Sequence, residues 1–253
     1  MGSDPLRIDF PGLEPPDSRR RKEAGGSGKG NGSPKGILLK GLAWITGLAA
    51  LALLPFYTLI RTSVYLQHTH GMSGWMALGA GALATVLLLF LYLVAVSLRL
   101  GGKGKVPKTA RRITGLLVAS YCLYALIYLS GVNAKTEEIR TTYTALHPVL
   151  RVAVSTLLLA DREGVLTDTG RTREDYDRWG LPVNESSLHL PQADGYVYAV
   201  DVRTVGRPEW RNRCVEFYFG FMGFETLRHV GTADHLHVNL VPGPGGGSLG
   251  LAP

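Results

Sequence analysis

The chain has 253 residues, of which 45% are hydrophobic, and a formal net charge of +7. The charge is unevenly placed, because residues 41–132 carry seven Lys/Arg and no acid, whereas residues 133–253 carry twelve Lys/Arg against fifteen Asp/Glu. A nucleic-acid-binding domain needs a basic face of its own, so this distribution argues against a nucleic-acid partner. Cys122 and Cys214 lie far apart and outside any Cys-x-x-Cys motif, which argues against a disulfide or a cysteine zinc site.

Three apolar segments predict a membrane protein. The first 35 residues are rich in Gly, Ser and charge, so we expect residues 1–35 to be a disordered cytoplasmic leader. The apolar segments follow at about residues 41–60, 74–98 and 113–132, and each is long enough to cross a hydrocarbon core of about 30 Å. Residues 36–132 are therefore predicted to form three transmembrane helices.

The charges of the loops predict the orientation of these helices. The leader contains the run RRRK, and the second loop, residues 99–112, contains six Lys/Arg, whereas the first loop carries Arg61 alone. By the positive-inside rule the leader and the second loop are cytoplasmic, and the chain after residue 132 lies outside. We therefore expect a multi-pass protein of the bacterial inner (cytoplasmic) membrane with a periplasmic or extracytoplasmic C-terminal domain.

The pattern of residues 133–242 predicts a small α+β domain with a mostly antiparallel sheet, followed by a flexible tail at residues 243–253. Its expected elements, in chain order, are a helix at about 136–160 broken near Pro148, a short strand, a turn at Gly170 and a charged helix within 165–182, a β-hairpin at 186–204, a helix ending at Gly223, and strands at 224–230 and 235–241.

A cluster of metal-binding residue types falls on the predicted strands. His235 and His237 alternate with Leu236, so both imidazoles point to one face, as in a metal site, a pH-sensitive surface or an accidental pair. The predicted hairpin carries His189 on one strand and Asp201 on the other. A catalytic zinc ion takes three protein ligands and a water, and mixed His/carboxylate sets are ordinary. A nearby carboxylate or imidazole can then accept the proton of that water.

The motifs S-x-H at 187–189, A-x-D at 199–201 and D-x-x-H at 234–237 occur in that order. In this they resemble the zinc D-Ala-D-Ala and L-Ala-D-Glu peptidases that cut peptidoglycan stem peptides, a group related to lysostaphin-type enzymes and the hedgehog domain. The resemblance covers about residues 145–240. It implies a hedgehog/D-Ala-D-Ala-peptidase-like fold, and its residue roles are the following: His189, Asp201 and His237 as ligands of Zn2+, Asp234 as general base, His235 as a second candidate for that role, and Arg171, or else Arg173, as the residue that steadies the substrate.

One departure from the family keeps two interpretations open. The interval of twelve residues between His189 and Asp201 is longer than is usual in the family, so either the hairpin is extended or the first ligand is another residue. The intact SLH and AVD motifs favour an extended hairpin. The function expected is a membrane-anchored zinc peptidase of peptidoglycan stem peptides. The alternatives are an inactive peptidase-like module that binds cell-wall peptides or a partner protein, and, less favoured, a transport or assembly subunit.

Overall fold

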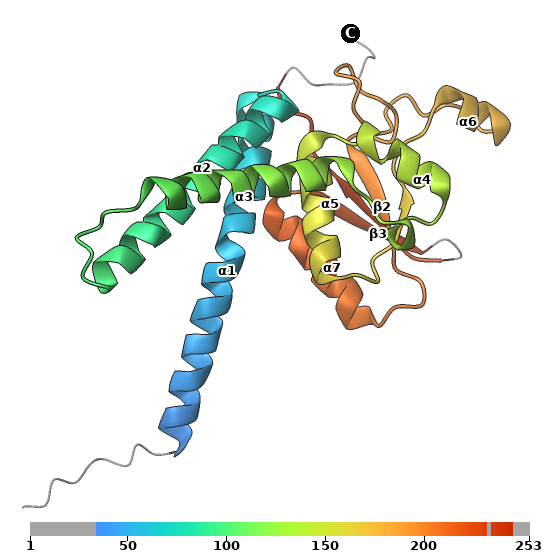
Figure 1. Ribbon diagram of the computed structural model, residues 1–253. Coiled ribbons are helices and arrows are strands. Elements are labelled where there is room, and N and C mark those ends of the chain that lie inside the picture. The colour runs from blue at the N-terminus through green and yellow to red at the C-terminus, as the bar shows by residue number, and fades with distance from the viewer. Residues whose placement is uncertain (1–33, 232–233, 245–253) are drawn as a thin grey trace, which may run out of the picture. The chain divides into compact units, whose positions relative to one another are not determined.

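The computed structural model describes residues 34–231 and 234–244 (Figure 1). The chain divides into two compact units, residues 1–48 and residues 49–253, and the described part of the first is the beginning of one helix. The predicted leader and tail lie almost wholly outside the described residues.

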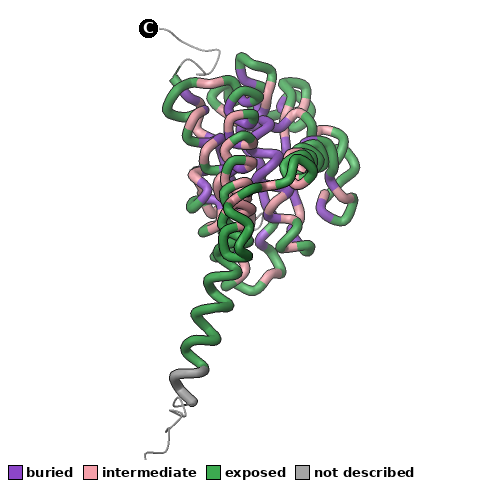
Figure 2. The backbone as a smooth tube through the Cα atoms, turned by 60° about the vertical axis from the view of Figure 1, so that its left-hand side comes forward, coloured by how far each residue is buried: buried purple, intermediate pink, exposed green. Residues whose placement is uncertain are grey.

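Three long apolar helices correspond to the three predicted membrane spans. They are α1 (Pro34–His70), α2 (Gly74–Arg99) and α3 (Lys108–Ile127), and by length and composition each could cross a membrane. Large apolar side chains along all three are exposed, and Figure 2 shows the long exposed stretch of α1 in green. A helix that exposes apolar side chains along its length suits a lipid environment, so the structure supports a membrane protein.

The third helix ends earlier than predicted, at Ile127 instead of residue 132. Tyr128 adopts an extended conformation, and the chain continues into the short 3-10 helix η2 (Gly131–Asn133). The helix can end inside an apolar segment because side chains of the following domain satisfy the carbonyls of its last turn. The hydroxyls of Tyr143 and Ser155 donate to the carbonyl of Ala125, and the Arg151 guanidinium donates to that of Leu126.

The described residues after α3 form a four-stranded antiparallel sheet and four α-helices of 6 to 14 residues. The strands are β1 (Leu166–Asp168), β2 (Ala199–Arg203), β3 (Glu225–His229) and β4 (His235–Asn239), in the spatial order β1-β2-β4-β3. The helices are α4 (Glu137–Thr142), α5 (Pro148–Ala160), α6 (Arg173–Arg178) and α7 (Glu209–Met222), with the 3-10 helix η3 (Tyr143–Ala145) between α4 and α5. The predicted break near Pro148 is confirmed, since Pro148 begins α5.

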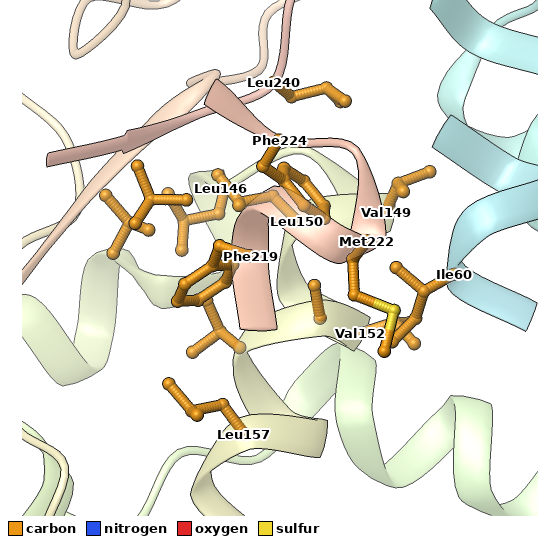
Figure 3. Packing of buried hydrophobic residues seen from close by; sticks show 14 of the residues in the cluster. Ile60, Leu146, Val149, Leu150, Val152, Leu157, Phe219, Met222, Phe224 and Leu240 are labelled. Atoms are coloured by element: carbon orange, nitrogen blue, oxygen red, sulfur yellow. The ribbon is translucent and has the colours of Figure 1, made fainter. Parts of the chain in front are cut away.

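Side-chain alternation divides the sheet into a core face and an open face. Val200 and Val202 of β2 and Val238 of β4 are fully buried and belong to the hydrophobic core. The core face is covered by α5 and α7, whose Leu150 and Phe219 lie among the labelled core residues of Figure 3. The polar residues that alternate with these valines must therefore point to the open face.

The core extends across the predicted domain boundary at residue 132. Leu59, Ile60 and Val64 of α1 are almost completely buried in the same cluster as Phe219 and Met222 of α7. Figure 3 shows Met222 beside Ile60. The second half of α1 is thus part of the folded domain as well as of an apolar helix.

The predicted hairpin at residues 186–204 is wrong in its first half. The second strand is β2, but residues 186–190 form turns and are not paired as a strand in the sheet. Two features divert this segment from a strand: the Ser187 hydroxyl accepts the backbone N–H of His189, and Pro191 has no N–H to give to a ladder. The segment still runs next to the approach to β2, because the N–H of Tyr198 donates to the carbonyl of Leu188 over 2.9 Å.

Substitutions of two glycines test how much the C-terminal cap of α7 contributes to stability. Gly223 caps the helix with φ 98°, and a Cβ there would overlap the Arg61 guanidinium and approach Val64. We expect Gly223→Ala to lower the free energy of unfolding by about 1 kcal/mol or more, because an L-residue is strained at this φ. Gly220→Ala is the control, since its Cβ would meet nothing within 4 Å, and it should leave stability unchanged or raise it by about 0.5–1 kcal/mol. Thermal unfolding of both variants in detergent measures the difference, and equal melting temperatures would contradict the prediction.

Candidate metal centre

Two of the predicted ligands lie opposite each other on neighbouring strands. Asp201 of β2 is the direct register partner of His237 of β4, in the middle of the five-residue β2–β4 ladder. Both point to the open face of the sheet, since Leu236 and Val238 on either side of His237 are buried in the core. The strand pairing therefore sets the distance between carboxylate and imidazole, and His237 Nδ1 lies 2.9 Å from Asp201 Oδ1.

The third predicted ligand arrives from the irregular segment before β2. The carbonyl of His189 accepts the backbone N–H of Arg171 over 2.8 Å, which ties the segment to the turn after β1. His189 is 4% exposed, so neighbouring residues surround its ring almost completely. Its Nε2 lies 3.2 Å from His237 Nδ1 and 3.3 Å from Asp201 Oδ1. His189 and Asp201, although twelve residues apart in the chain, therefore lie side by side in the structure.

The three donor atoms form a nearly equilateral triangle with sides of 2.9, 3.2 and 3.3 Å. Zinc bonds of about 2.0–2.1 Å in a tetrahedron place neighbouring donor atoms about 3.3 Å apart. The sides of the triangle are close to that spacing, and His189, Asp201 and His237 form a group able to hold a metal ion. Two imidazoles and one carboxylate are also a donor set that zinc favours.

Protons alone cannot satisfy all three contacts in this triangle. A neutral imidazole carries one N–H, and a nitrogen that donates this hydrogen cannot accept another. If both facing nitrogens carry hydrogen, the contact between His189 and His237 is repulsive. If either nitrogen carries none, its lone pair faces the lone pairs of the ionised Asp201 carboxylate. A cation at the centre would be favourable to all three donor atoms at once, so the residues present fit a metal ion.

The buried carboxylate is held in its ionised form. Burial by itself raises the pKa of Asp201, but hydrogen bonds with His189 and His237 and the nearby His235 outweigh it and hold this pKa well below its ordinary value. Asp201 is 4% exposed. It can therefore serve as an anionic ligand without first losing a proton at neutral pH.

Asp168 is a functional candidate that the sequence analysis missed. Its Oδ1 lies 3.6 Å from His189 Nδ1, the ring nitrogen that does not face the other two ligands, and its Oδ2 accepts from Arg171 Nε over 2.6 Å. A carboxylate hydrogen-bonded behind a metal-binding histidine orients the ring and selects its tautomer. Asp168 is the carboxylate next to His189 Nδ1, a buried nitrogen with no hydrogen-bond partner among the described residues, and a shift of a few tenths of an ångström would close that contact. The signal in the sequence is an aspartate at the end of a short strand, and it becomes informative only with the β1–β2 register, in which Asp168 is opposite Asp201.

Of the two candidate arginines, the structure brings Arg171 to the cluster. Its NH2 lies 3.9 Å from Asp201 Oδ2, and its guanidinium lies over the Trp179 ring at 5.9 Å. Arg173 instead forms a bidentate pair with exposed Glu185 over 2.5 and 2.7 Å.

The two base candidates differ in their surroundings. His235 Nε2 lies 3.5 Å from Asp201 Oδ2, at the edge of the cluster, and its ring stacks on His229 with centroids 4.7 Å apart. Asp234 accepts two hydrogen bonds from Arg228, over 2.8 and 3.1 Å, and one from the Thr204 hydroxyl. The hydrogen bonds from Arg228, assisted by that from Thr204, hold the pKa of Asp234 below its ordinary value. A carboxylate stabilised in this way is a weaker base.

No protein-family model matches the chain, and no curated protein or solved structure matches it significantly.

The triangle predicts that the purified full-length chain binds one equivalent of zinc. We expect His189→Ala, Asp201→Ala and His237→Ala each to lose it, since each removes one of three donors. His70→Ala is the control, because His70 is an exposed histidine at the end of α1. Metal analysis after dialysis against trace zinc measures the content. Retention of stoichiometric zinc by any of the three ligand variants would remove that residue from the site.

The contact between Asp168 and His189 predicts a graded effect on metal affinity. Asp168→Asn should weaken zinc binding about 10–100-fold without abolishing it, because the ligands remain but one ring loses its orienting carboxylate. Asp177→Asn on α6 replaces an exposed aspartate and serves as the matched control. Competition with a chelating dye gives both affinities. Unchanged affinity in Asp168→Asn would mean that the carboxylate serves Arg171 alone.

Proposed function

We propose that this protein is a membrane-anchored zinc peptidase that hydrolyses an amide bond in peptidoglycan stem peptides outside the cytoplasmic membrane. The observation that carries the proposal is the triangle of His189 Nε2, Asp201 Oδ1 and His237 Nδ1, whose sides suit a tetrahedral metal. The choice of peptidoglycan as substrate rests on the ordered motifs and their resemblance to the zinc D-Ala-D-Ala and L-Ala-D-Glu peptidases.

His189, Asp201 and His237 would hold the zinc ion. Zinc bound there would supply a Lewis acid that polarises the scissile carbonyl and lowers the pKa of a water molecule. In the hydrolysis, the water oxygen bonds to the carbonyl carbon, the C–N bond breaks, and the proton of the water passes to the leaving amine. Asp201 contributes a negative charge that is present at neutral pH, since its pKa is held low by its histidine neighbours.

The proton transfer is assigned to His235. Its Nε2 lies 3.5 Å from Asp201 Oδ2, at the edge of the cluster. Asp234 is the weaker base of the two candidates, because hydrogen bonds from Arg228 and Thr204 stabilise its ionised form. His235 would take the proton from the attacking water and return it to the amine nitrogen. Arg171, half-buried and close to both Asp168 and Asp201, would pair with a substrate carboxylate or with the developing oxyanion.

The charge of the loops supports the proposed orientation in the membrane. Six Lys/Arg in residues 99–112, which cover the end of α2, the loop and the start of α3, favour a cytoplasmic position for that loop, which leaves the domain on the outer side. On that side of a bacterial inner membrane, peptidoglycan is the abundant substrate that carries D-amino acids.

An inactive module that binds cell-wall peptides or a partner protein is the second candidate. It is favoured by one observation: the aspartate in the family position of the general base is engaged by Arg228 through both of its oxygens. Such a module would keep the metal triangle as a structural or recognition site.

Hydrolysis of a synthetic stem pentapeptide ending in D-Ala-D-Ala tests the proposal. Zinc-loaded wild type in detergent should release product that mass spectrometry identifies, and a chelator should stop the release. His235→Ala should lower kcat about 10²–10⁴-fold with zinc content unchanged, because general-base catalysis is removed but no ligand is lost. Asp234→Asn should have a smaller effect.

The reverse order of the two variants would make Asp234 the base. A zinc-loaded wild type that cleaves neither this peptide nor tri- and tetrapeptide stems would overturn the peptidase assignment and favour the binding module.

A further inference from the structure

The outer face of α7 is aromatic and exposed. Trp210, Cys214, Phe217 and Phe221 follow one another at intervals of four, three and four residues, and at about 100° per residue they fall within an arc of about 60°. Trp210 is 67% exposed, Phe217 71% and Phe221 54%. The opposite side of the helix carries the buried residues Asn212, Val215, Phe219 and Met222. The helix therefore has one face for the core and a second apolar face, here called the aromatic stripe, which consists of Trp210, Cys214, Phe217 and Phe221.

The aromatic stripe is a continuous surface. The rings of Phe217 and Phe221 are stacked with centroids 5.7 Å apart. Scattered apolar side chains on a protein surface are ordinary, but contiguous aromatic patches usually mark contact with a membrane or a partner. Charged groups of both signs flank this one, since Arg211 pairs with Asp161 and Glu163 on one side, and Arg213 pairs with Glu209 and Glu216 on the other. An aromatic face bordered by charged groups suits a helix that lies in the lipid headgroup region.

The stripe is continuous with the first apolar helix. The ring of Phe221 packs on that of Tyr57 in α1, with centroids 4.8 Å apart. Arg61, one turn later in α1, is the first charged residue after the uncharged segment 41–60, and its guanidinium lies against Gly223 at the end of α7. A charged residue after a span marks the level of the membrane surface. Tyr57 precedes Arg61 by about 6 Å of helix, so its contact with Phe221 lies on the membrane side of that level.

We infer that the aromatic stripe of α7 rests in the headgroup region of the bilayer that the apolar helices cross. The domain that follows α3 then lies on the membrane surface, with α7 against the lipid. Tyr57 in the span and Phe221 in the stripe belong to one aromatic surface, which favours lipid over a protein partner as its cover. The inference does not depend on a bound metal or on peptidase activity.

This placement has a consequence for the candidate metal centre. The inner side of α7 packs on the core face of the sheet, where Phe219 shares a cluster with Val200 and Val238. Asp201 and His237 lie on the other face of the same strands. With the stripe on lipid, the order from the bilayer outward is α7, sheet, metal centre. The centre then faces away from the membrane.

Cys214 provides a probe within the stripe itself. Replacing Cys122, which packs against the core, by the smaller Ala leaves Cys214 as the single thiol. Cys214 is exposed, so an environment-sensitive fluorophore can be attached to it. The matched control carries the fluorophore at Glu174→Cys on α6, an exposed position, in a chain that lacks both native cysteines. Both proteins are reconstituted into vesicles of phosphatidylethanolamine and phosphatidylglycerol. Quenching is measured with iodide in the water and with nitroxides attached near the lipid headgroups.

The inference predicts that the label at Cys214 is blue-shifted, quenched several-fold more by the lipid nitroxide than the label at Glu174→Cys, and correspondingly protected from iodide. Equal quenching of the two labels by iodide would overturn it, because the stripe would then face water. Protection from both quenchers, with formation of Cys214–Cys214 cross-links in the unlabelled chain, would also overturn it and assign the stripe to contact between copies. Melting temperatures equal to that of the wild type confirm that both labelled proteins are folded.

Discussion

In the antiparallel pair of β2 and β4, Asp201 stands opposite His237 and Val200 opposite Val238. Because side chains alternate across a sheet, this single register sends the valines into the core and the aspartate and histidine to the open face. A slip of one residue would set Asp201 against a buried apolar partner and would place an imidazole among α5 and α7. Core packing and the candidate metal centre are therefore stabilised by the same pairing. A substitution that disturbs the core packing of these strands should therefore also disturb the geometry of the candidate metal centre.

The candidate centre brings a buried carboxylate together with two imidazole nitrogens, and no placement of hydrogens satisfies all three contacts at once. A carboxylate that is 4% exposed is costly to bury, and here its neighbours are imidazoles whose nitrogens also face each other. A second set of residues holds them in place, since Asp168 lies behind His189 and is itself bound by Arg171. Two of the candidate ligands lie on paired strands, and the third lies on a turn whose position depends on backbone hydrogen bonds. His189 is consequently the candidate ligand whose placement is least fixed by the sheet.

The sequence predicted what depends on local pattern. Long uncharged segments were enough for three apolar helices, and alternation around Leu236 was enough to place His235 and His237 on one face. What it could not predict depends on partners distant in the chain. The early end of α3 requires Arg151 and Tyr143 to reach its carbonyls. The position of Asp168 requires the β1–β2 register, and the pairing of Asp234 requires Arg228 on the neighbouring strand β3. The irregular shape of residues 186–190 reflects competition by a serine hydroxyl and a proline, which hydrophobic alternation alone does not register.

One hydrophobic core joins the second half of α1 to the domain that carries the candidate metal centre. Ile60 and Val64 of α1 are buried with Phe219 and Met222 of α7, so the helix that precedes the domain also completes its interior. Cutting the chain after the third apolar helix would expose this surface, which makes the full-length protein the appropriate unit for measuring metal binding. The same contacts hold α7 against α1 at Tyr57 and Arg61, and the sheet lies on the other side of α7. The core therefore fixes the orientation of the open face relative to the second half of α1.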